Sequence, residues 1–320
     1  MKVVVFGGAG FIGCTLVEKL LDQFFEVYVI DNFRKGIESV ASFMPRNRLD
    51  IRYGDIRNIH QIKKQIIEID PDVIVLASGI VGLDDCNNNP EETKRVNVDG
   101  WRNVADACVG YPIIGLSTGS VYGKLEEVCT EDSPCNPVSL YGTTKLEGEK
   151  PILDVGGVIY RYATAGGVSR NMRMNLIPNM LTYDAIKDKK LDIYQPGAKR
   201  TFIDIEDFAN SIIFAINNHP FMRGKIYNVG DNDNNWTKKQ IAEYIQKKTR
   251  CELTYNSDKE DPDLRDYAVD FSRINKLGFK CKKSVENMVD DLYEYFIEQT
   301  YSKYELDPEY VDMYFSKENK

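Results

Sequence analysis

The chain has few histidines and no closely paired cysteines. Only His60 and His219 occur among its 320 residues, and its seven cysteines include no Cys-x-x-Cys pair. Structural zinc sites are built from closely spaced cysteine and histidine ligands. The sequence therefore gives a Cys/His site little support, and we predict no metal. An odd number of cysteines without paired spacing favours buried or surface thiols in a reducing compartment.

A surplus of positive charge and a long apolar run are also missing. The formal net charge is −8 at pH 7, which disfavours binding to nucleic acid or to an anionic membrane. No apolar stretch reaches the roughly 18 residues of a membrane-spanning helix. The first expected strand begins at Lys2, which leaves no space for a cleavable signal. We therefore predict a cytoplasmic protein with neither nucleic-acid nor membrane partners.

The remaining composition is that of a soluble globular chain, with 42% hydrophobic and 28% charged residues. Its length allows two modest domains, or one large domain with a substrate lobe. We find no internal repeat and no low-complexity linker. Any two lobes are therefore expected to be interleaved along the chain.

A glycine-rich turn stands near the amino end. The apolar, β-branched run Lys2–Phe6 leads into Gly7, Gly10 and Gly13, and a helical pattern follows over 14–21. In a dinucleotide-binding turn, the first glycine allows the tight turn and the second lets the backbone approach the pyrophosphate. The third lets helix and strand pack closely, and the phosphates lie at the helix N-terminus. An ordinary strand–turn–helix with incidental glycines is the alternative.

An acid after the second expected strand favours the dinucleotide site. The apolar run 27–30 ends at Asp31, and an acid about 20 residues beyond the glycines is where ribose hydroxyls are held. A carboxylate there would repel a 2′-phosphate, so NAD is the expected cofactor.

Strands and helices alternate along the chain, which predicts an α/β fold with a doubly wound parallel sheet. In such a sheet, ligands bind at the carboxyl ends of the strands. We predict an NAD-binding domain of residues 1–165 and 200–230, and a smaller substrate lobe of residues 166–199 and 231–320. The expected strands are 2–6, 27–30, 50–53, 73–77, 113–116, 158–162, 192–194, 201–204 and 226–229. The expected helices are 14–21, 61–69, 91–108, one that opens at 141, 176–186, 208–216, 237–248 and 285–299, and 32–48 and 78–89 are expected loops.

Three residues form a candidate catalytic set. Tyr141 and Lys145 are four residues apart, so they share one face of a helix. A lysine ammonium there would lower the tyrosine pKa from about 10 toward neutrality, as a general base requires. Thr118, at a strand end, could share the proton or bind a developing alkoxide. An exposed helical pair is the alternative for Tyr-x-x-x-Lys, but the dinucleotide turn and Asp31 favour catalysis.

Together these motifs resemble the extended short-chain dehydrogenase/reductases of the NAD-dependent sugar epimerase/dehydratase family, in particular its UDP-glucose 4-epimerase-like members. The resemblance runs over nearly the whole chain. It covers the glycine turn, Asp31-Asn32, Gly54–Arg57, Leu76-Ala77, Asn97–Gly100, Ser117–Gly123, Tyr141–Lys145 and Arg200–Asp204.

The resemblance implies a Rossmann fold, an NAD site and a nucleotide-diphosphate sugar as substrate. Within it, Asp55 would reach the adenine, and Lys145 would also hold the nicotinamide ribose. Arg200 and Arg265 match the arginines that clamp the substrate pyrophosphate, although a solvated surface charge is the alternative for Arg265. The implied cofactor residues are Gly7, Gly10, Phe11, Ile12, Gly13, Asp31, Asn32, Asp55, Ile56, Leu76, Ala77, Asn97, Ser117, Tyr141 and Lys145. The implied substrate residues are Ser120, Thr164, Asn175, Leu176, Tyr194, Arg200 and Arg265.

Departures from the family pattern narrow the reaction. The 4,6-dehydratases carry Asp-Glu directly after the catalytic threonine, and the related decarboxylases keep the glutamate. This chain has Gly119-Ser120 instead, as epimerases commonly do. Thr164 stands where many 4-epimerases have an asparagine. The segments 80–86 and 170–174 resemble a bacterial subgroup that acts on unusual nucleotide-activated sugars, some members of which stop at the 4-keto sugar.

A further departure concerns the helix after Lys145. Pro151 and Gly156-Gly157 are expected to cut it short. In the family this helix forms half of a dimer seam, and we expect a homodimer.

The sequence thus predicts an NAD-dependent epimerase of a nucleotide-activated sugar, acting at C4. Tyr141 would take the hydroxyl proton while hydride leaves the same carbon for the nicotinamide, and hydride would return to the other face of the keto sugar. A 4-dehydrogenase or 4-keto reductase with net redox change is the enzymatic alternative. A non-catalytic NAD-binding protein is the alternative from another class.

Overall fold

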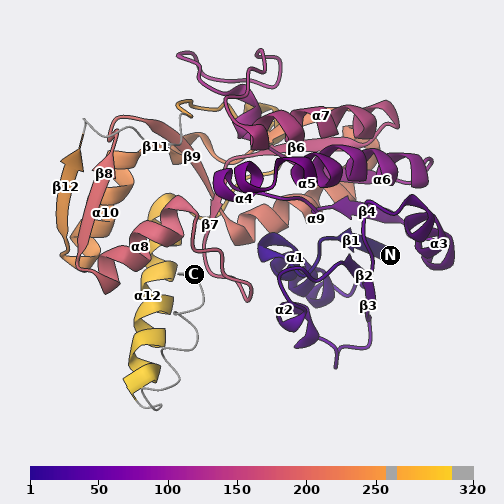
Figure 1. The fold of residues 1–320 in the computed structure, drawn as a ribbon, viewed down its shortest axis with the longest axis horizontal. Coiled ribbons are helices and arrows are strands. Elements are labelled where there is room, and N and C mark those ends of the chain that lie inside the picture. Colours follow the sequence, from indigo (N-terminus) through magenta and orange to yellow (C-terminus); the bar gives the residue numbers. More distant parts are fainter. Residues whose placement is uncertain (257–264, 305–320) are drawn as a thin grey trace.

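A seven-stranded parallel β-sheet forms the centre of the protein (Figure 1). The computed structural model describes residues 1–256 and 265–304. All neighbouring strands of this sheet are parallel, in the order β10-β6-β5-β4-β1-β2-β3. The strands are β1 (Lys2–Phe6), β2 (Glu26–Asp31), β3 (Leu49–Tyr53), β4 (Val73–Leu76), β5 (Ile113–Thr118), β6 (Val158–Tyr162) and β10 (Ile226–Val229). The predicted doubly wound sheet is confirmed, and the strand order reverses between β1 and β4, where such folds bind ligands.

Alternating residues of β1 show why helices cover both faces of the sheet. Val3 and Val5 belong to one buried cluster, whereas Val4 and Phe6 belong to the other. Successive residues of a strand point to opposite faces, so an unbroken apolar strand needs cover on both sides. One face is covered by α1 (Phe11–Asp22) and α9 (Ile205–Met222), and the other by α3 (Ile59–Ile69), α6 (Trp101–Ala107) and α7 (Leu140–Asp154).

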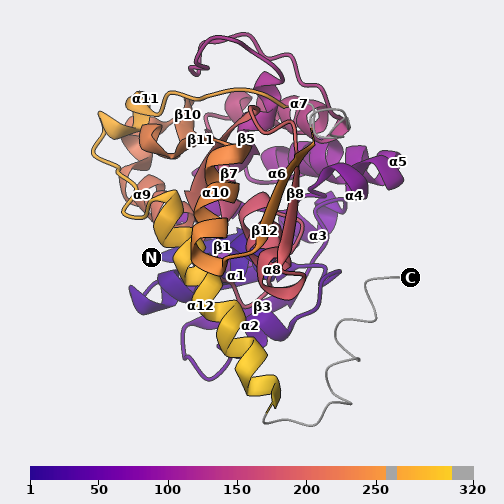
Figure 2. The same ribbon diagram turned by 90° about the vertical axis from the view of Figure 1, so that its left-hand side faces the viewer.

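A third buried cluster is built mainly from later parts of the chain. Figures 1 and 2 show its helices and the β8–β12 pair grouped beside the central sheet. Its helices are α8 (Ile177–Lys187), α10 (Lys238–Thr249) and α12 (Val285–Tyr304). Strand β8 (Lys190–Tyr194) pairs with β12 (Glu252–Asn256), and β7 (Thr164–Gly166), β9 (Lys199–Asp204) and β11 (Asn235–Thr237) form a three-stranded sheet.

This cluster draws most of its side chains from the predicted substrate lobe, with Phe202 of β9 as a contribution from the predicted NAD-binding domain. Two segments of that lobe, 257–264 and 305–320, lie outside the described residues. The division into an NAD-binding domain and a substrate lobe stays a prediction. No described helix combines the length and the apolarity needed to cross a membrane.

The expected end of the helix at Pro151 is wrong, because α7 continues through this residue to Asp154, whereas its end just before Gly156-Gly157 agrees with the prediction. A proline inside a helix removes one backbone hydrogen bond. Ile152, however, is fully buried in the core against the sheet, and this burial retains the last turn. The helix ends before Gly156, whose φ of +82° lies in the left-handed region.

Short elements occupy segments that the sequence predicts as loops or as one helix. The segment 32–48 contains α2 (Glu38–Ala41), and the segment 78–89 contains α4 (Leu83–Asn88). The predicted helix 91–108 is divided into α5 (Pro90–Lys94), a π-helical turn at Arg95–Gly100, and α6. The remaining short helices are 3₁₀ turns at Gly119–Tyr122 and Asn232–Asn234, and α11 (Ser272–Asn275).

Candidate active site

The glycine-rich turn joins β1 to α1 at the carboxyl edge of the sheet. Gly7 has a φ of +82°, and a Cβ there would lie 2.7 Å from the backbone nitrogen of Ser78. A Cβ on Gly13 would lie 2.2 Å from the carbonyl oxygen of Gly7, whereas one on Gly10 would have its nearest neighbour at 3.5 Å. The backbone path therefore needs glycine at 7 and 13. Space remains at Gly10 for a group that approaches the turn.

The N-terminus of α1 opens onto this turn. In the described part of the chain, no side chain donates or accepts a capping hydrogen bond at Gly10, the N-cap of α1. The first turn of α1 contains no acidic residue. The first N–H groups of a helix, here from Phe11, Ile12 and Gly13, have no acceptor within the helix. These groups and the helix dipole favour an anion. The turn therefore fits the pyrophosphate of a dinucleotide.

Asp31, the last residue of β2, is tied to the same turn. Its Oδ2 accepts a hydrogen bond from the N–H of Ala9 at 3.0 Å, and its Oδ1 accepts one from Phe33 at 2.8 Å. Burial raises the pKa of this carboxyl, and the backbone hydrogen bonds oppose the rise. Ser39 and Asn171 each donate to the carbonyl of Ala9 at 2.8 Å. A carboxylate oxygen accepts more than one hydrogen bond, so Asp31 can still receive ribose hydroxyls.

Asp55 follows β3 and is paired with a neighbouring arginine. Its carboxylate accepts hydrogen bonds from Arg57, one of them from Nε at 2.8 Å, and from Asn32 at 3.4 Å. The hydrogen bond from Arg57 lowers the pKa of Asp55 to about 2. A hollow of about 410 Å³ lies beside this pair, also lined by Arg95 and Asp99. The contact of Asp55 with the adenine stays a prediction.

Four other predicted cofactor residues, Ile56, Leu76, Ala77 and Asn97, lie near the carboxyl edge of the sheet. The side chains of Ile56 and Leu76 are buried in the core, and the N–H of Ala77 donates to the carbonyl of Phe6 at 2.9 Å. Asn97 is fully buried in the π-helical turn. Its side chain bonds both backbone groups of Ile80, at 2.8 and 2.9 Å, and thereby fixes the loop after β4.

Ser117 belongs to a buried ionic network under the site. Its Oγ donates to Glu149 of α7 at 2.5 Å. The same carboxylate receives hydrogen bonds from Arg161 of β6, the shortest of them 2.7 Å. The side chain of Ser117 therefore faces α7, and it joins this helix to the sheet.

Thr118, the last residue of β5, is the centre of a polar cluster. Its Oγ1 donates to Ser120 at 3.0 Å, and it shares a side-chain hydrogen bond with Tyr141. The Ser120 hydroxyl also accepts a hydrogen bond from Arg265 at 2.8 Å. Ser139 caps α7 and places Tyr141 in the first turn of this helix. The structure thus brings Thr118, Ser120, Tyr141 and Arg265 together.

The predicted lowering of the tyrosine pKa by Lys145 is wrong for this structure. Burial raises the pKa of Tyr141, and the positive charges of Arg173 and Arg265 and the hydrogen bond with Thr118 oppose the rise. Arg173 lies in the segment before α8, with its Nη2 3.0 Å from the place of a Cβ on Gly82. Arg173 and Arg265 are thus the cations that most lower this pKa.

Lys145 is buried and contacts an aromatic ring. Its Nζ lies 3.6 Å from the centre of the Trp101 ring, and 3% of the residue is exposed. Burial lowers the pKa of Lys145 to about 7, against the opposing influence of Glu149 and Cys86.

The predicted substrate residues lie over several elements. Arg200 is buried in β9 and donates to the backbone carbonyl of Arg265. Thr164 opens β7, and Leu176 directly precedes α8. Asn175 accepts a hydrogen bond from Arg173 at 2.9 Å, and Tyr194 ends β8 with its carbonyl bonded to Lys238 at 3.0 Å. Arg200 thus adjoins the Ser120–Arg265 cluster.

Three residues at the site are missing from the predicted set: Trp101, Arg173 and Asn171. Trp101 is one of only two tryptophans and is four residues from Asn97 on a helical pattern, which is a usable signal. Arg173 and Asn171 stand in a polar stretch without periodicity. Their proximity to Tyr141 and Ala9 comes from the folded chain alone.

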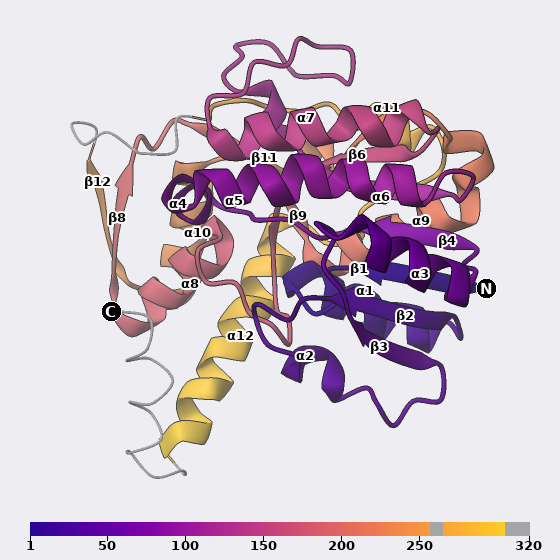
Figure 3. The same cartoon turned by 45° about the vertical axis from the view of Figure 1, so that its right-hand side comes forward.

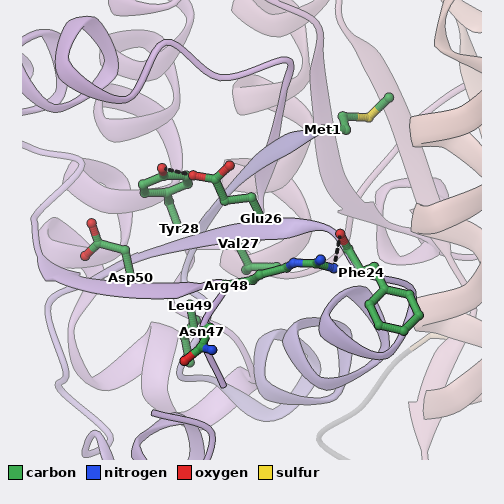
Figure 4. A pocket seen from close by; sticks show the side chains of 9 residues that line it. All are labelled: Met1, Phe24, Glu26, Val27, Tyr28, Asn47, Arg48, Leu49 and Asp50. Carbon is green, nitrogen blue, oxygen red and sulfur yellow. Dashed lines mark hydrogen bonds between the residues drawn. The ribbon is translucent and has the colours of Figure 1, made fainter. Parts of the chain in front are cut away.

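A second pocket lies at the opposite edge of the sheet, where the strands begin (Figure 4). It measures about 440 Å³ and lies among residues at the starts of β1, β2 and β3. Arg48 donates to the carbonyl of Phe24 at 3.1 Å and lies over its ring. No predicted site residue lines this pocket.

Comparison with known proteins agrees with the geometry. Residues 3–230 match the NAD dependent epimerase/dehydratase family. A bifunctional UDP-glucose 4-epimerase and UDP-xylose 4-epimerase of Pisum sativum is 25% identical over 92% of this chain and 95% of its own length. The structure of a UDP-glucuronic acid 4-epimerase from Bacillus cereus, in complex with UDP-glucuronic acid and NAD, has a TM-score of 0.82 and 26% identity. It covers 93% of this chain and 100% of its own.

A dTDP-glucose 4,6-dehydratase from Bacillus anthracis shares the fold, with a TM-score of 0.81 and 22% identity over 93% of this chain and 97% of its own. The match over 3–230 spans most of the chain, and it includes the glycine turn, Asp31, Thr118, Tyr141 and Lys145. The chain therefore belongs to the NAD dependent epimerase/dehydratase family and is an enzyme whose cofactor is NAD.

Proposed function

We propose that the protein epimerises a nucleotide-activated sugar at C4, through a transient 4-keto sugar. The observation that carries this proposal is the cluster at the end of β5. Thr118 and Tyr141 share a hydrogen bond there, and the next two positions are Gly119 and Ser120. A glycine and a serine supply no carboxyl group for eliminating water from C5 and C6. Proton transfer at a secondary alcohol is the chemistry that the cluster supports.

The groups around Tyr141 suit a proton relay. Tyr141 as a phenolate can take the proton of the C4 hydroxyl, and Arg173 and Arg265 favour the phenolate that this transfer requires. Thr118 can donate to the same sugar oxygen when its hydroxyl turns from Ser120, to which it donates at 3.0 Å. NAD, when bound, supplies the acceptor and later the donor of the hydride. For inversion, the keto sugar must turn within the site before the phenol returns its proton.

The substrate is proposed to be a nucleotide-diphosphate sugar, whose pyrophosphate Arg200 and Arg265 would hold. The Pisum sativum and Bacillus cereus relatives, which act on UDP-sugars, support this substrate class. We further propose a cytoplasmic homodimer. Figure 3 shows the helices of 90–107 side by side with α7 on one face, where such a dimer would form. Light scattering of the purified protein tests this assembly.

Substitution of the proposed base tests the function. Tyr141→Phe should retain NAD and lower the epimerisation rate by about 100-fold or more, since general acid–base catalysis contributes 10²–10⁴. Tyr255→Phe, on β12 and 42% exposed, is the control and should leave the rate unchanged. The assay follows interconversion of C4 epimers of UDP-glucose, UDP-xylose and UDP-glucuronic acid. Unchanged turnover in Tyr141→Phe would remove the base assignment.

A 4-dehydrogenase or 4-keto reductase is the second candidate, supported by the resemblance of 80–86 and 170–174 to a bacterial subgroup, some members of which stop at the 4-keto sugar. Absorbance at 340 nm separates the two functions. An epimerase accumulates no NADH at steady state, whereas a dehydrogenase forms it in proportion to the sugar oxidised.

A further inference from the structure

The indole of Trp101 lies directly against the ammonium group of Lys145. The Nζ atom is 3.6 Å from the ring centre, and Trp101 is completely buried. A cation over an aromatic face is attracted by the ring quadrupole, and the attraction is strongest where water is excluded. The contact joins the first residue of α6 to the second turn of α7, on which Tyr141 also lies.

Close packing fixes the ring in this place. Its Nε1 donates to the carbonyl of Ser78 at 3.0 Å, in the loop after β4. A Cβ on Gly115 of β5 would lie 3.0 Å from the ring, and a Cβ on Gly148 of α7 would lie 3.3 Å from it. Two glycines thus provide the space that the indole fills, and the ring has no alternative position nearby.

Two other titratable groups near Lys145 are either already hydrogen-bonded or neutral. On its own helix, Glu149 already receives hydrogen bonds from Arg161 and Ser117. Across from it, on α4, Cys86 is buried, which raises the pKa of its thiol and keeps it neutral near pH 7. Of the charged and titratable groups in the described residues, these two act on Lys145. The indole face is therefore the group that contacts the ammonium directly, at 3.6 Å, while Glu149 acts on it through its charge.

We propose that Trp101 is a positioning residue for Lys145, and that its indole face fixes the place of the lysine Nζ at the floor of the cofactor site. The task of the lysine at the nicotinamide ribose rests on the proposed function, whereas the contact with the indole does not. The ring contacts an ammonium at low pH and an amine at high pH. Burial sets the pKa of Lys145 at about 7, so the environment of the indole changes within an accessible pH range.

Fluorescence of a protein with a single tryptophan tests this contact. Trp236, on β11, donates to the carbonyl of Asp233 and is replaced by Phe, which leaves Trp101 as the only emitter. Between pH 5.5 and 9, its emission should change in one step with a midpoint near 7. The step should vanish in Trp236→Phe/Lys145→Met. Emission without a step, or a step that persists without the lysine, would overturn the proposal.

A second experiment measures kcat and KM of Trp101→Phe and Trp101→Leu as a function of pH. Trp101→Leu should lower kcat about tenfold or more and move the pH midpoint of kcat, with the KM for the nucleotide sugar within twofold. Trp101→Phe, which keeps an aromatic face, should fall between Trp101→Leu and the parent protein. Trp236→Phe is the control. Identical pH profiles in all four proteins would contradict the positioning role. If no sugar is converted by the parent protein, the proposed function fails, and the fluorescence step still decides the contact.

Discussion

The carbonyl oxygen of Gly7 lies 2.2 Å from the position that a Cβ on Gly13 would occupy. Real Cβ atoms do not approach an oxygen so closely, and backbone on both sides of the contact prevents relief. Gly13→Ala should therefore displace α1 from the turn and destabilise the protein by about 1–3 kcal/mol, the usual cost of overpacking. Thermal unfolding of the variant measures the loss.

Gly10→Ala is the matched control, because its Cβ would have an ordinary contact at 3.5 Å. We expect this variant to melt at the temperature of the parent protein when free of cofactor. Its affinity for NAD should nevertheless fall, because a pyrophosphate at the N-terminus of α1 would meet the added methyl group. Tight NAD binding by Gly10→Ala would show that the cofactor does not approach this glycine.

A second prediction concerns the buried ion pair of Glu149 and Arg161, whose closest atoms are 2.7 Å apart. Removing one partner leaves the other charge buried and uncompensated, which typically costs 3–5 kcal/mol. Glu149→Gln should lose about this much stability in urea denaturation. Glu147→Gln, exposed on the same helix, should change it by less than about 0.5 kcal/mol. Equal stabilities would mean that Arg161 finds another acceptor.

The positions of the central strands along the chain could be predicted from the sequence because their apolar runs are bounded by polar residues. The predicted runs 2–6, 158–162 and 226–229 coincide with β1, β6 and β10. Each strand is buried on both faces, so local hydrophobicity and tertiary packing point to the same assignment. The strand-end positions of Asp31 and Thr118 followed from these boundaries.

Contacts between distant segments could not be anticipated. The contact of Lys145 with Trp101 joins residues 44 positions apart, and helical spacing alone pairs Lys145 with Tyr141 instead. The three-residue strands β7 and β11 carry too few residues for a periodic signal. Pro151 stayed helical because Ile152 is buried, a fact of packing that local propensity does not contain.

A third prediction uses the pKa of Lys145, which burial lowers to about 7. The lysine of an unfolded chain keeps its proton up to about pH 10.4. Between pH 7 and 10 the unfolded state therefore binds more protons, and the stability contributed by this residue rises with pH. Below pH 7 both states are charged, and the full cost of burying the charge remains.

Lys145→Met should consequently be more stable than the parent protein at pH 6.5, by an amount on the order of 4 kcal/mol. This difference should shrink by about 1.4 kcal/mol for each pH unit above 7. Urea denaturation of the cofactor-free proteins at pH 6.5, 8 and 9 measures it. Lys150→Met, with a side chain 82% exposed on the same helix, should show no such trend. A pH-independent difference would place the pKa of Lys145 outside this range.

The last prediction concerns the segment 169–171, which spans the entrance of the glycine-rich turn. Asn171 donates to the carbonyl of Ala9 at 2.8 Å, and Ser169 donates to that of Phe11 at 2.9 Å. Arg170 pairs with Glu18 at 3.0 Å. We expect that this segment, held at Ala9, Phe11 and Glu18, detaches before NAD leaves the turn.

Arg170→Ala/Asn171→Ala removes two of these attachments, each worth about 1 kcal/mol. We expect NAD to dissociate about tenfold faster or more, while the melting temperature of the cofactor-free protein changes little because the lost groups are partly exposed. Arg46→Ala is the matched control: Arg46 also pairs with an acid of α1, Asp22 at 2.6 Å, and lies over the same Phe43 ring as Arg170. Asp22, however, ends the helix, far from the turn. Stopped-flow displacement of NADH measures the rate, and equal rates in the double variant and Arg46→Ala would mean that the segment does not retain the cofactor.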